Sequence, residues 1–187
     1  MKTFPLIILS GLLLCSSIQS FGQQRYFTRS GHISFFSSTP LEDIKADNRQ
    51  VASVIDLTSG EMAFSVLMRS FEFTKALMQE HFNENYIESD KYPKSTFKGK
   101  ILNAPSVDTN KEGVYKVNIE GELTIHGVTK PVKTEGTLEV KEGKILGKSN
   151  FTVAVADYNI QIPALVRDNI AKTIDIKIDM TYEPFKQ

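Results

Sequence analysis

The side chains that could carry out chemistry are few in this sequence and lie far apart. The three histidines, His32, His81 and His126, include no pair at the three- or four-residue spacing that places two metal ligands on one helix face. The only cysteine, Cys15, lies in an N-terminal stretch that we expect to be cleaved off. The sequence therefore predicts no metal site, no disulfide and no cofactor.

Catalytic motifs are also missing. The chain contains no G-x-S-x-G elbow and no phosphate-binding glycine loop. Ser70, Glu80 and His81 could be combined into a hydrolytic set, but their spacing gives this no support. We expect a protein that is not an enzyme, and a hydrolase is the weakest hypothesis.

Three polar side chains near a glycine turn admit either a binding role or a bland one. His126 could contact a polar head group, or its ring could hydrogen-bond the turn that Gly127 makes possible; the strand register predicts an outward, structural position. Lys130 and Thr129 could bind a phosphate, although a lysine beside a turn is usually solvated. His32 is expected to be an exposed strand residue.

The stronger chemical signal is apolar. The chain has 12 Phe and no Trp, and one set of apolar residues is expected to point into a barrel or to cap one end of it. These residues are Phe64, Val66, Met68, Phe71, Phe73, Phe82, Phe97, Ile101, Phe151, Val153, Ile160 and Ile162. If they fill the interior they form only a core, whereas a tunnel between them would bury an acyl or prenyl chain at about 0.8 kcal/mol per CH₂.

These residues belong to segments in which apolar and charged residues alternate. The stretch 121–132, GELTIHGVTKPV, joins two such segments, and a period of two indicates half-buried antiparallel strands. It predicts the turn of a long hairpin. Other strands are expected at 26–38 (two pieces around Gly31), 48–57, 61–69, 96–102, 144–154 and 174–180, with a turn at 40–46, one helix at 71–83, a polar loop at 83–94 and a short helical turn at 165–170.

About eight or nine strands with short turns and one short helix indicate an all-β fold, as a sandwich or an up-and-down barrel. Long strands joined to their sequence neighbours favour the antiparallel β-barrel of about eight strands, because closure removes exposed edges. Lys+Arg and Asp+Glu are both 22, so no basic excess suggests a nucleic-acid partner.

The N-terminus is expected to be a secretory signal peptide covering residues 1–22, followed by one domain over 23–187. A positive start and the short apolar run at 6–14 precede small residues at Ser20 and Gly22. Acylation of Cys15 is disfavoured because Leu14 stands where that signal needs a small residue. We expect a periplasmic or secreted protein of a Gram-negative-type envelope, without stable membrane insertion.

Several strings resemble the YceI-like family of secreted bacterial proteins. The most characteristic is LTIHGVTKPV at Leu123–Val132; Glu80-His81-Phe82 at the helix end, Tyr92-Pro93 before Phe97, and the segment from Phe151 to Asp157-Tyr158 agree with it. Gln79 departs from the family, which has an Arg beside the acidic residue. The resemblance covers nearly all of the chain after residue 22.

The resemblance implies a lipocalin-like barrel that binds polyisoprenoid chains, quinone-like tails or fatty acyl groups and is not catalytic. It gives weight to His81 as a mouth residue, although a histidine at a helix C-terminus also suits the helix dipole. With Tyr86 and Tyr158 it forms our set of head-group candidates. The first hypothesis is a carrier or store of a long-chain isoprenoid or acyl lipid. The alternative is a filled barrel that acts as a structural or adaptor protein through its loops; a homodimer stays open.

Overall fold

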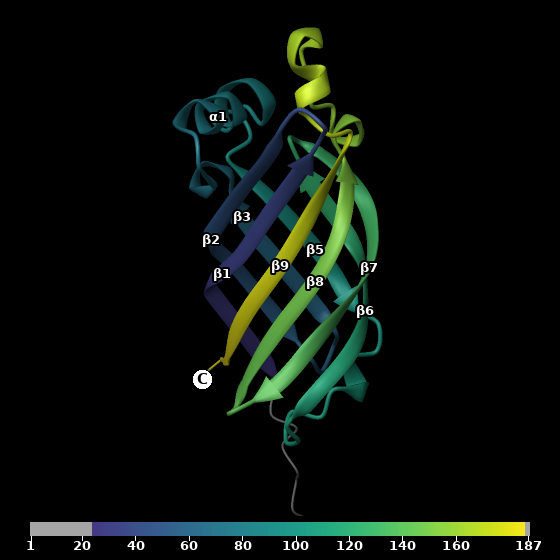
Figure 1. Cartoon of the computed structure of the whole chain (residues 1–187). Coiled ribbons are helices and arrows are strands. Elements are labelled where there is room, and N and C mark those ends of the chain that lie inside the picture. Colours follow the sequence, from purple (N-terminus) through teal and green to yellow (C-terminus); the bar gives the residue numbers. More distant parts are fainter. Residues whose placement is uncertain (1–23, 186–187) are drawn as a thin grey trace, which may run out of the picture.

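The computed structural model describes residues 24–185, and eight strands of this part close into an antiparallel β-barrel (Figure 1). They are β1 (Arg25–Ser38), β2 (Asp43–Asp56), β3 (Glu61–Leu67), β5 (Lys94–Ile101), β6 (Gly113–Ile125), β7 (Val128–Lys141), β8 (Lys144–Ala154) and β9 (Thr173–Pro184). Strands pair with their neighbours along the chain, and β1 closes the barrel by pairing with both β2 and β9. A ninth strand, β4 (Glu72–Phe73), pairs only with β2. The predicted fold class is confirmed.

The hairpin of β6 and β7 shows why these residues form strands. The pairing runs without a register shift from Gly113↔Val140 to Ile125↔Val128. His126 and Gly127 both have positive φ, 50° and 74°, which is the requirement of the two-residue turn that matches strand twist. A Cβ at Gly127 would lie 2.6 Å from Cε1 of Tyr92. The predicted long hairpin is confirmed, and position 127 of its turn favours glycine.

Three local predictions were wrong in their bounds. The segment 26–38 belongs to one strand, β1, whose register shifts around Gly31, instead of two pieces. Strand β2 already begins at Asp43, so the expected turn at 40–46 is shorter. The helix does not begin at residue 71, because Phe73 pairs with Ala46 of β2 and tertiary pairing overrides the local pattern. It consists of α1 (Ala76–His81), which continues as the π-helix η2 (Phe82–Tyr86).

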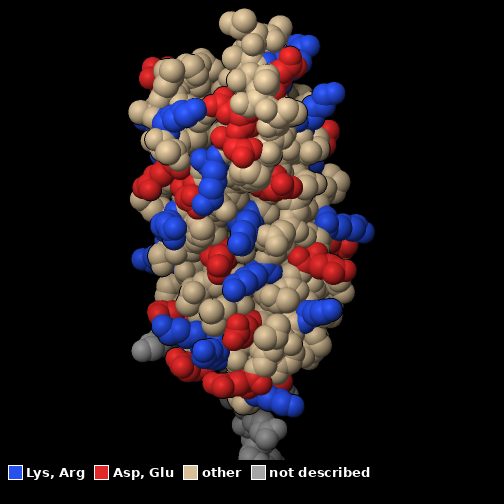
Figure 2. Space-filling view, in the orientation of Figure 1, with Lys and Arg blue, Asp and Glu red and all other residues tan. Residues whose placement is uncertain are grey.

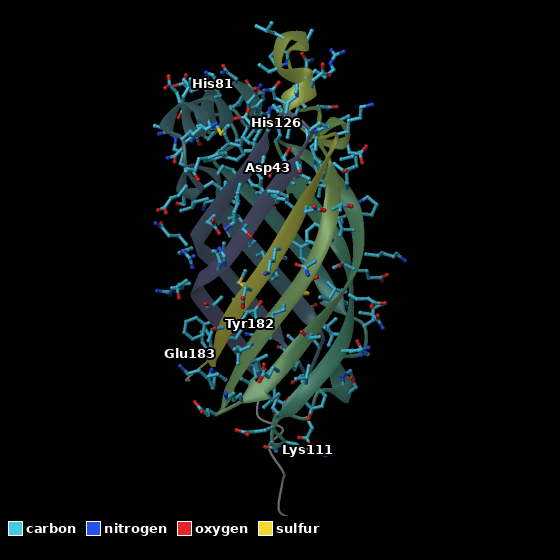
Figure 3. All side chains as sticks on the ribbon, viewed as in Figure 1. Asp43, His81, Lys111, His126, Tyr182 and Glu183 are labelled. Atoms are coloured by element: carbon cyan, nitrogen blue, oxygen red, sulfur yellow. The ribbon has the colours of Figure 1, made fainter. Side chains whose placement is uncertain are left out.

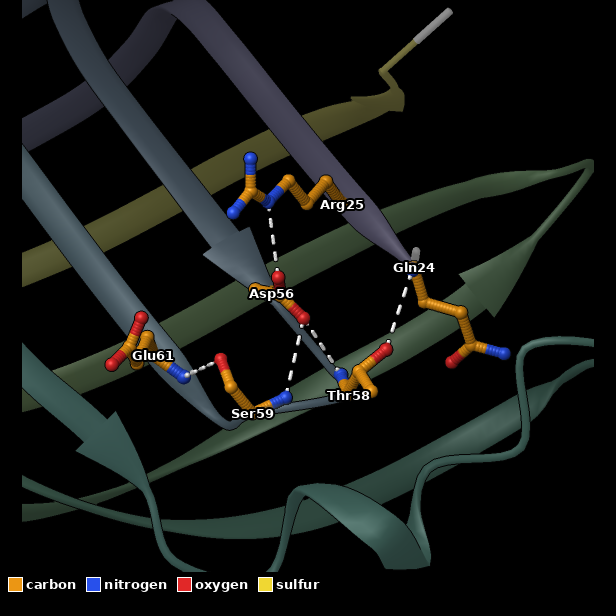
Figure 4. Close-up of polar contacts among 6 residues, drawn as sticks. All are labelled: Gln24, Arg25, Asp56, Thr58, Ser59 and Glu61. Atoms are coloured by element: carbon orange, nitrogen blue, oxygen red, sulfur yellow. Dashed lines mark hydrogen bonds and ion pairs between the residues drawn. The ribbon is translucent and has the colours of Figure 1, made fainter. Parts of the chain in front are cut away.

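The end of the barrel that holds the connections 56–61, 101–113 and 141–144 is closed. Side chains at this end are buried, among them Leu57, Ala104, Val107 and Ile145. Asp56 organises the first connection: its Oδ2 accepts from Nε of Arg25 at 3.0 Å, and its Oδ1 accepts from the amides of Thr58 and Ser59 at 2.9 and 3.2 Å (Figure 4). We call this end the closed end.

The opposite end carries the longer connections, 38–43, 67–94, 125–128 and 154–173, and we call it the open end. It contains α1, η2 and the 3₁₀ helices η1 (Met68–Ser70), η4 (Val155–Tyr158) and η5 (Ala164–Asn169). Figure 1 shows α1 and η5 on this end, at the top of the view. The helical turn predicted at 165–170 is confirmed as η5.

The expected signal peptide at residues 1–22 lies outside the described residues. Within 24–185, no helix has the length and apolar character needed to cross a bilayer.

Candidate functional site

The barrel encloses a cavity of about 340 Å³. Its wall is almost wholly apolar and draws on all eight barrel strands and on the open-end helices. It reaches Ile55, Ile101 and Tyr182 towards the closed end, and His81 and Asn169 at the open end. Figure 3 shows Tyr182 low on the barrel and His81 at the open end. The cavity is therefore a tube with one open end.

All twelve residues of the predicted apolar set line this cavity. Phe64 and Val66 of β3 and Ile101 of β5 are buried, while Phe97 of β5 and the two residues of β8, Phe151 and Val153, are half-buried. That a ligand contacts them stays a prediction. The prediction did not name many further lining residues, although the alternation of apolar and polar residues on β1, β2, β6, β7 and β9 could have found them. They include Ile33, Phe35, Ile44, Ile55, Val117, Ile119, Leu123, Ile125, Val132, Leu138, Ile174, Ile176, Ile178 and Met180.

Four phenylalanines pack together beneath the open end. Phe35 of β1 meets Phe71, Phe73 and Phe82 with ring centroids 5.4, 5.7 and 5.5 Å away. Phe82 also lies 5.7 Å from Phe71 and 5.1 Å from Phe73. Offset and edge contacts at these distances are favourable beyond the burial of area. This cluster attaches the helical segment to the barrel and forms part of the cavity wall.

A pair of facing glycines makes room for Phe97 in the wall. Gly99 of β5 and Gly121 of β6 are register partners, and a Cβ at either would lie 2.6 or 2.7 Å from Cζ of Phe97. The ring therefore occupies the space that two side chains would fill. A ring that lies flat against the wall occupies less of the cavity volume than a ring that points across the cavity.

Several hydroxyl groups in or beside the wall have partners within the protein. The buried hydroxyls of Tyr182 and Ser53 lie 2.9 Å apart, and Oγ of Ser53 lies 2.9 Å from the carbonyl oxygen of Ala63. Burial raises the pKa of Tyr182 well above its usual value, so its hydroxyl stays neutral. Ser95 Oγ contacts Sδ of Met68 at 3.0 Å. Such a wall suits a ligand without polar groups along its length.

The three head-group candidates all line the cavity at its open end. His81 is exposed at the end of α1, Tyr86 is half-buried in η2, and Tyr158 is buried at the end of η4. Burial raises the pKa of both tyrosines, and nearby Asp157 adds to the effect at Tyr158. Both phenols therefore stay protonated at neutral pH and can donate a hydrogen bond to a ligand's polar end.

Glu42 is a lining residue that sequence reasoning missed. Its Oε1 accepts from Nζ of Lys75 at 2.8 Å and its Oε2 accepts from Nδ2 of Asn169 at 3.3 Å. The hydrogen bonds from Lys75 and Asn169 hold the pKa of Glu42 below its usual value. One carboxylate thus joins the β1–β2 turn, the residue before α1, and η5. No sequence pattern signals this contact, because its partners are 33 and 127 residues away.

His126 does not point outward as the sequence predicted. Its side chain is 11% exposed, with Nε2 2.7 Å from Oε2 of Glu88 and Nδ1 3.1 Å from the carbonyl oxygen of Tyr158. The ring of Tyr92 meets it edge-on at 4.5 Å. The error arose because His126 lies in the turn, where the strand alternation ends. The expected structural role agrees with these contacts, which hold three open-end segments together.

Two of the remaining polar candidates hydrogen-bond to neighbouring side chains. Ser70 Oγ donates to Oε1 of Gln50 at 3.3 Å, and Nε2 of His32 lies 2.7 Å from Oδ1 of Asp47 on the barrel wall. Among residues 24–185, no three His, Cys, Asp or Glu side chains are placed to hold a metal ion.

Solved structures with the same fold come from several bacteria. A polyisoprenoid-binding domain from Saccharophagus degradans, implicated in plant cell wall breakdown, has a TM-score of 0.76 at 16% identity and covers 87% of this chain and 99% of its own. BcnA from Burkholderia cenocepacia has a TM-score of 0.67 at 15% identity, and the match covers 81% of this chain and 95% of BcnA. The YceI protein of Campylobacter jejuni gives 0.55 at 16%, covering both chains fully.

No curated protein matches the sequence. The family model described as YceI-like domain matches residues 20–182, which is nearly the whole chain. The match includes the whole barrel from β1 into β9 and every residue of the predicted apolar set. The chain therefore belongs to the YceI-like family.

Proposed function

We propose that this protein binds the apolar tail of a long-chain lipid inside the barrel and carries or stores that lipid in the cell envelope. The observation that carries the proposal is the apolar cavity of about 340 Å³, open at one end, in which the deep hydroxyl of Tyr182 is paired with Ser53. This volume lies in the range of about 300–1,000 Å³ that small-molecule pockets occupy.

The energetics favour long tails over short ones. Each CH₂ moved from water into the cavity contributes about 0.8 kcal/mol, while association costs about 4–15 kcal/mol in lost freedom. A tail of about ten carbons or more is therefore needed before burial alone offsets that cost. The ligand classes that fit are polyisoprenoids, quinone-like tails and fatty acyl chains.

Two observations favour an isoprenoid among these classes. The structural relative from Saccharophagus degradans is described as polyisoprenoid-binding. The wall offers many Phe and Met side chains, which can adapt to a branched chain. In this proposal the tail contacts the twelve predicted lining residues, and the head group lies beside His81, Tyr86 and Tyr158.

The direct test is native mass spectrometry of the gently purified protein, followed by organic extraction. We expect a bound lipid of long chain length and uptake of a fluorescent isoprenoid probe by the stripped protein. A protein that is free of lipid and also ignores the probe would overturn the proposal. That result would favour the alternative, an adaptor protein with a filled barrel. The open cavity argues against a filled barrel.

Charge placed inside the barrel provides the matched test. Phe64→Glu and Phe151→Glu should abolish probe uptake, because a carboxylate in the wall has no partner. Val54→Glu is the control, since Val54 points outward on β2, next to β3. Circular dichroism should report the barrel in all three variants. A folded Phe64→Glu variant that still takes up probe would contradict the assigned cavity.

Export is part of the proposal and has its own readout. The mass of the protein from the envelope fraction should correspond to a chain that begins at Gln23. A full-length mass, or recovery only from the cytoplasm, would remove the envelope role while leaving lipid binding intact.

A further inference from the structure

Three leucines at the open end are exposed although leucine is usually buried. Leu165 of η5 is 94% exposed, Leu41 in the β1–β2 turn is 68% exposed, and Leu77 of α1 is 61% exposed. A single exposed leucine is ordinary on a protein surface. These three come from separate connections that meet at one end of the barrel (Figure 1). We call them the leucine rim.

The leucine rim borders the cavity mouth. Each rim leucine is followed in the chain by a residue that lines the cavity: Glu42 follows Leu41, Met78 follows Leu77 and Val166 follows Leu165. The rim segments are also tied to one another, because Glu42 accepts hydrogen bonds from Lys75 and Asn169, which lie close in sequence to Leu77 and Leu165. The exposed leucines therefore form one apolar border around the opening rather than three unrelated positions.

Exposed leucines and charged residues lie side by side at this end. Figure 2 shows charged residues of both signs over the barrel wall and also beside the tip that projects at the top of the molecule. That tip corresponds to η5 in Figure 1, where exposed Arg167 and Asp168 follow Leu165 in the chain. Exposed leucines beside charges of both signs suit a surface that inserts a few side chains and keeps the rest in water.

We propose that the leucine rim docks on a lipid bilayer and delivers the cavity mouth to it; this inference rests on the proposed function. A long-chain lipid leaves a bilayer into water only at the full cost of exposing its tail. The closed end is sealed by buried side chains, so the tail passes through the open end. With the rim leucines in the bilayer, the tail moves between two apolar phases without crossing water. The rim is apolar, so a zwitterionic bilayer suffices as the partner.

The test uses phosphatidylcholine vesicles with the folded protein that begins at Gln23. The rim variant is Leu77→Ser/Leu165→Ser. The matched control is Leu102→Ser/Val114→Ser, which changes two comparably exposed residues at the closed end; Leu102 is 56% exposed. All four positions are exposed, so the fold should survive in both. Sedimentation with vesicles should fall about tenfold or more for each rim leucine lost and stay unchanged in the control.

Transfer kinetics separate this inference from the proposed function. A fluorescent isoprenoid probe is offered in vesicles and, separately, from ethanol without vesicles. We expect a transfer rate that rises with vesicle concentration, is slowed at least tenfold in the rim variant, and is unchanged in the control, with equal probe uptake from ethanol for all three proteins.

Each other outcome has a definite meaning. Equal transfer by the rim variant, or a rate independent of vesicle concentration, overturns docking and leaves lipid binding standing. If the wild-type protein takes up no probe from ethanol, the proposed function is wrong. Docking is then still decided by whether the protein sediments with vesicles that carry no probe. If the wild type fails to sediment but forms dimers that the rim variant does not, the rim is a contact between copies and the docking proposal falls.

Discussion

At the residue scale, the cavity depends on a few positions where the size of the side chain determines whether the wall can form. Gly121 is one of them, because a Cβ there would lie 2.4 Å from the carbonyl oxygen of Lys98 and 2.5 Å from Cα of Gly99. Those atoms are backbone and cannot turn aside. Val117 is another: it is buried, lies near the start of β6 at the closed end and lines the cavity.

Gly121→Ala should destabilise the protein by about 1–3 kcal/mol, the usual cost of overpacking. Urea unfolding measures the change. Gly113→Ala, where the nearest atom to a new Cβ is 3.9 Å away, is the control and should change stability by less than about 1 kcal/mol. If the two variants lose the same stability, β5 and β6 must be able to move apart to accept the extra methyl group at position 121.

Val117→Phe should shorten the tube from its closed end. Affinity for long isoprenoid probes should drop, while shorter ones keep theirs, because the added ring occupies only the deep part of the cavity. Competition between probes of graded length measures this. A uniform loss at every length would mean that the ring distorts the barrel, and no loss would mean that tails do not reach Val117.

Tyr182→Phe tests the buried hydroxyl pair. Removing the Tyr182 hydroxyl should lower the free energy of unfolding by about 1 kcal/mol. The cost stays small because Ser53 keeps its hydrogen bond to the carbonyl oxygen of Ala63. Tyr115→Phe is the comparison on the exposed side, where the hydroxyl donates to the carbonyl oxygens of Asp108 and Lys111 at 3.1 and 3.0 Å. The buried variant should lose more.

At the element scale, polar contacts fix the open-end connections while apolar alternation fixes the strands. His126 joins the β6–β7 turn to the loop at Glu88 and to η4. His126→Ala should therefore lower the unfolding free energy by about 1–3 kcal/mol, since it leaves partly buried acceptors without a donor. Hydrogen exchange should accelerate in residues 86–92 and 155–160 and stay unchanged in β9. His32→Ala, which removes a pair on the outer wall, should cost less than about 1 kcal/mol.

The same division explains what could be predicted from the sequence. The strands and their inward faces leave a period of two, so the barrel and residues such as Phe64 and Ile101 were predictable. The contacts of Glu42 and His126 join residues far apart in the chain and leave no periodic trace. The start of α1 was missed because the pairing of Phe73 with β2 and the phenylalanine cluster outweigh the local helical pattern.

At the scale of the whole molecule, stability in acid should follow the carboxylates that the fold uses. Burial raises the pKa of Asp56, but hydrogen bonds from Arg25, Ser59 and Thr58 outweigh it, so the pKa lies below its ordinary 3.8. A lowered folded-state pKa gives stability that is complete above the unfolded value and is lost as pH falls through the folded value. Unfolding free energy should thus decline below about pH 4, and less steeply in Asp56→Asn. Parallel pH profiles for the two proteins would contradict this role.

The closed end has a consequence for how occupants replace one another. A tube with one opening admits a molecule tail first and returns it by the same route, so the next occupant waits until the last has left. Exchange is then sequential, and its rate is limited by exit of the bound molecule. Under the proposed lipid binding, this geometry would retain one lipid until it leaves through the open end, and the closed end provides no passage along the barrel axis.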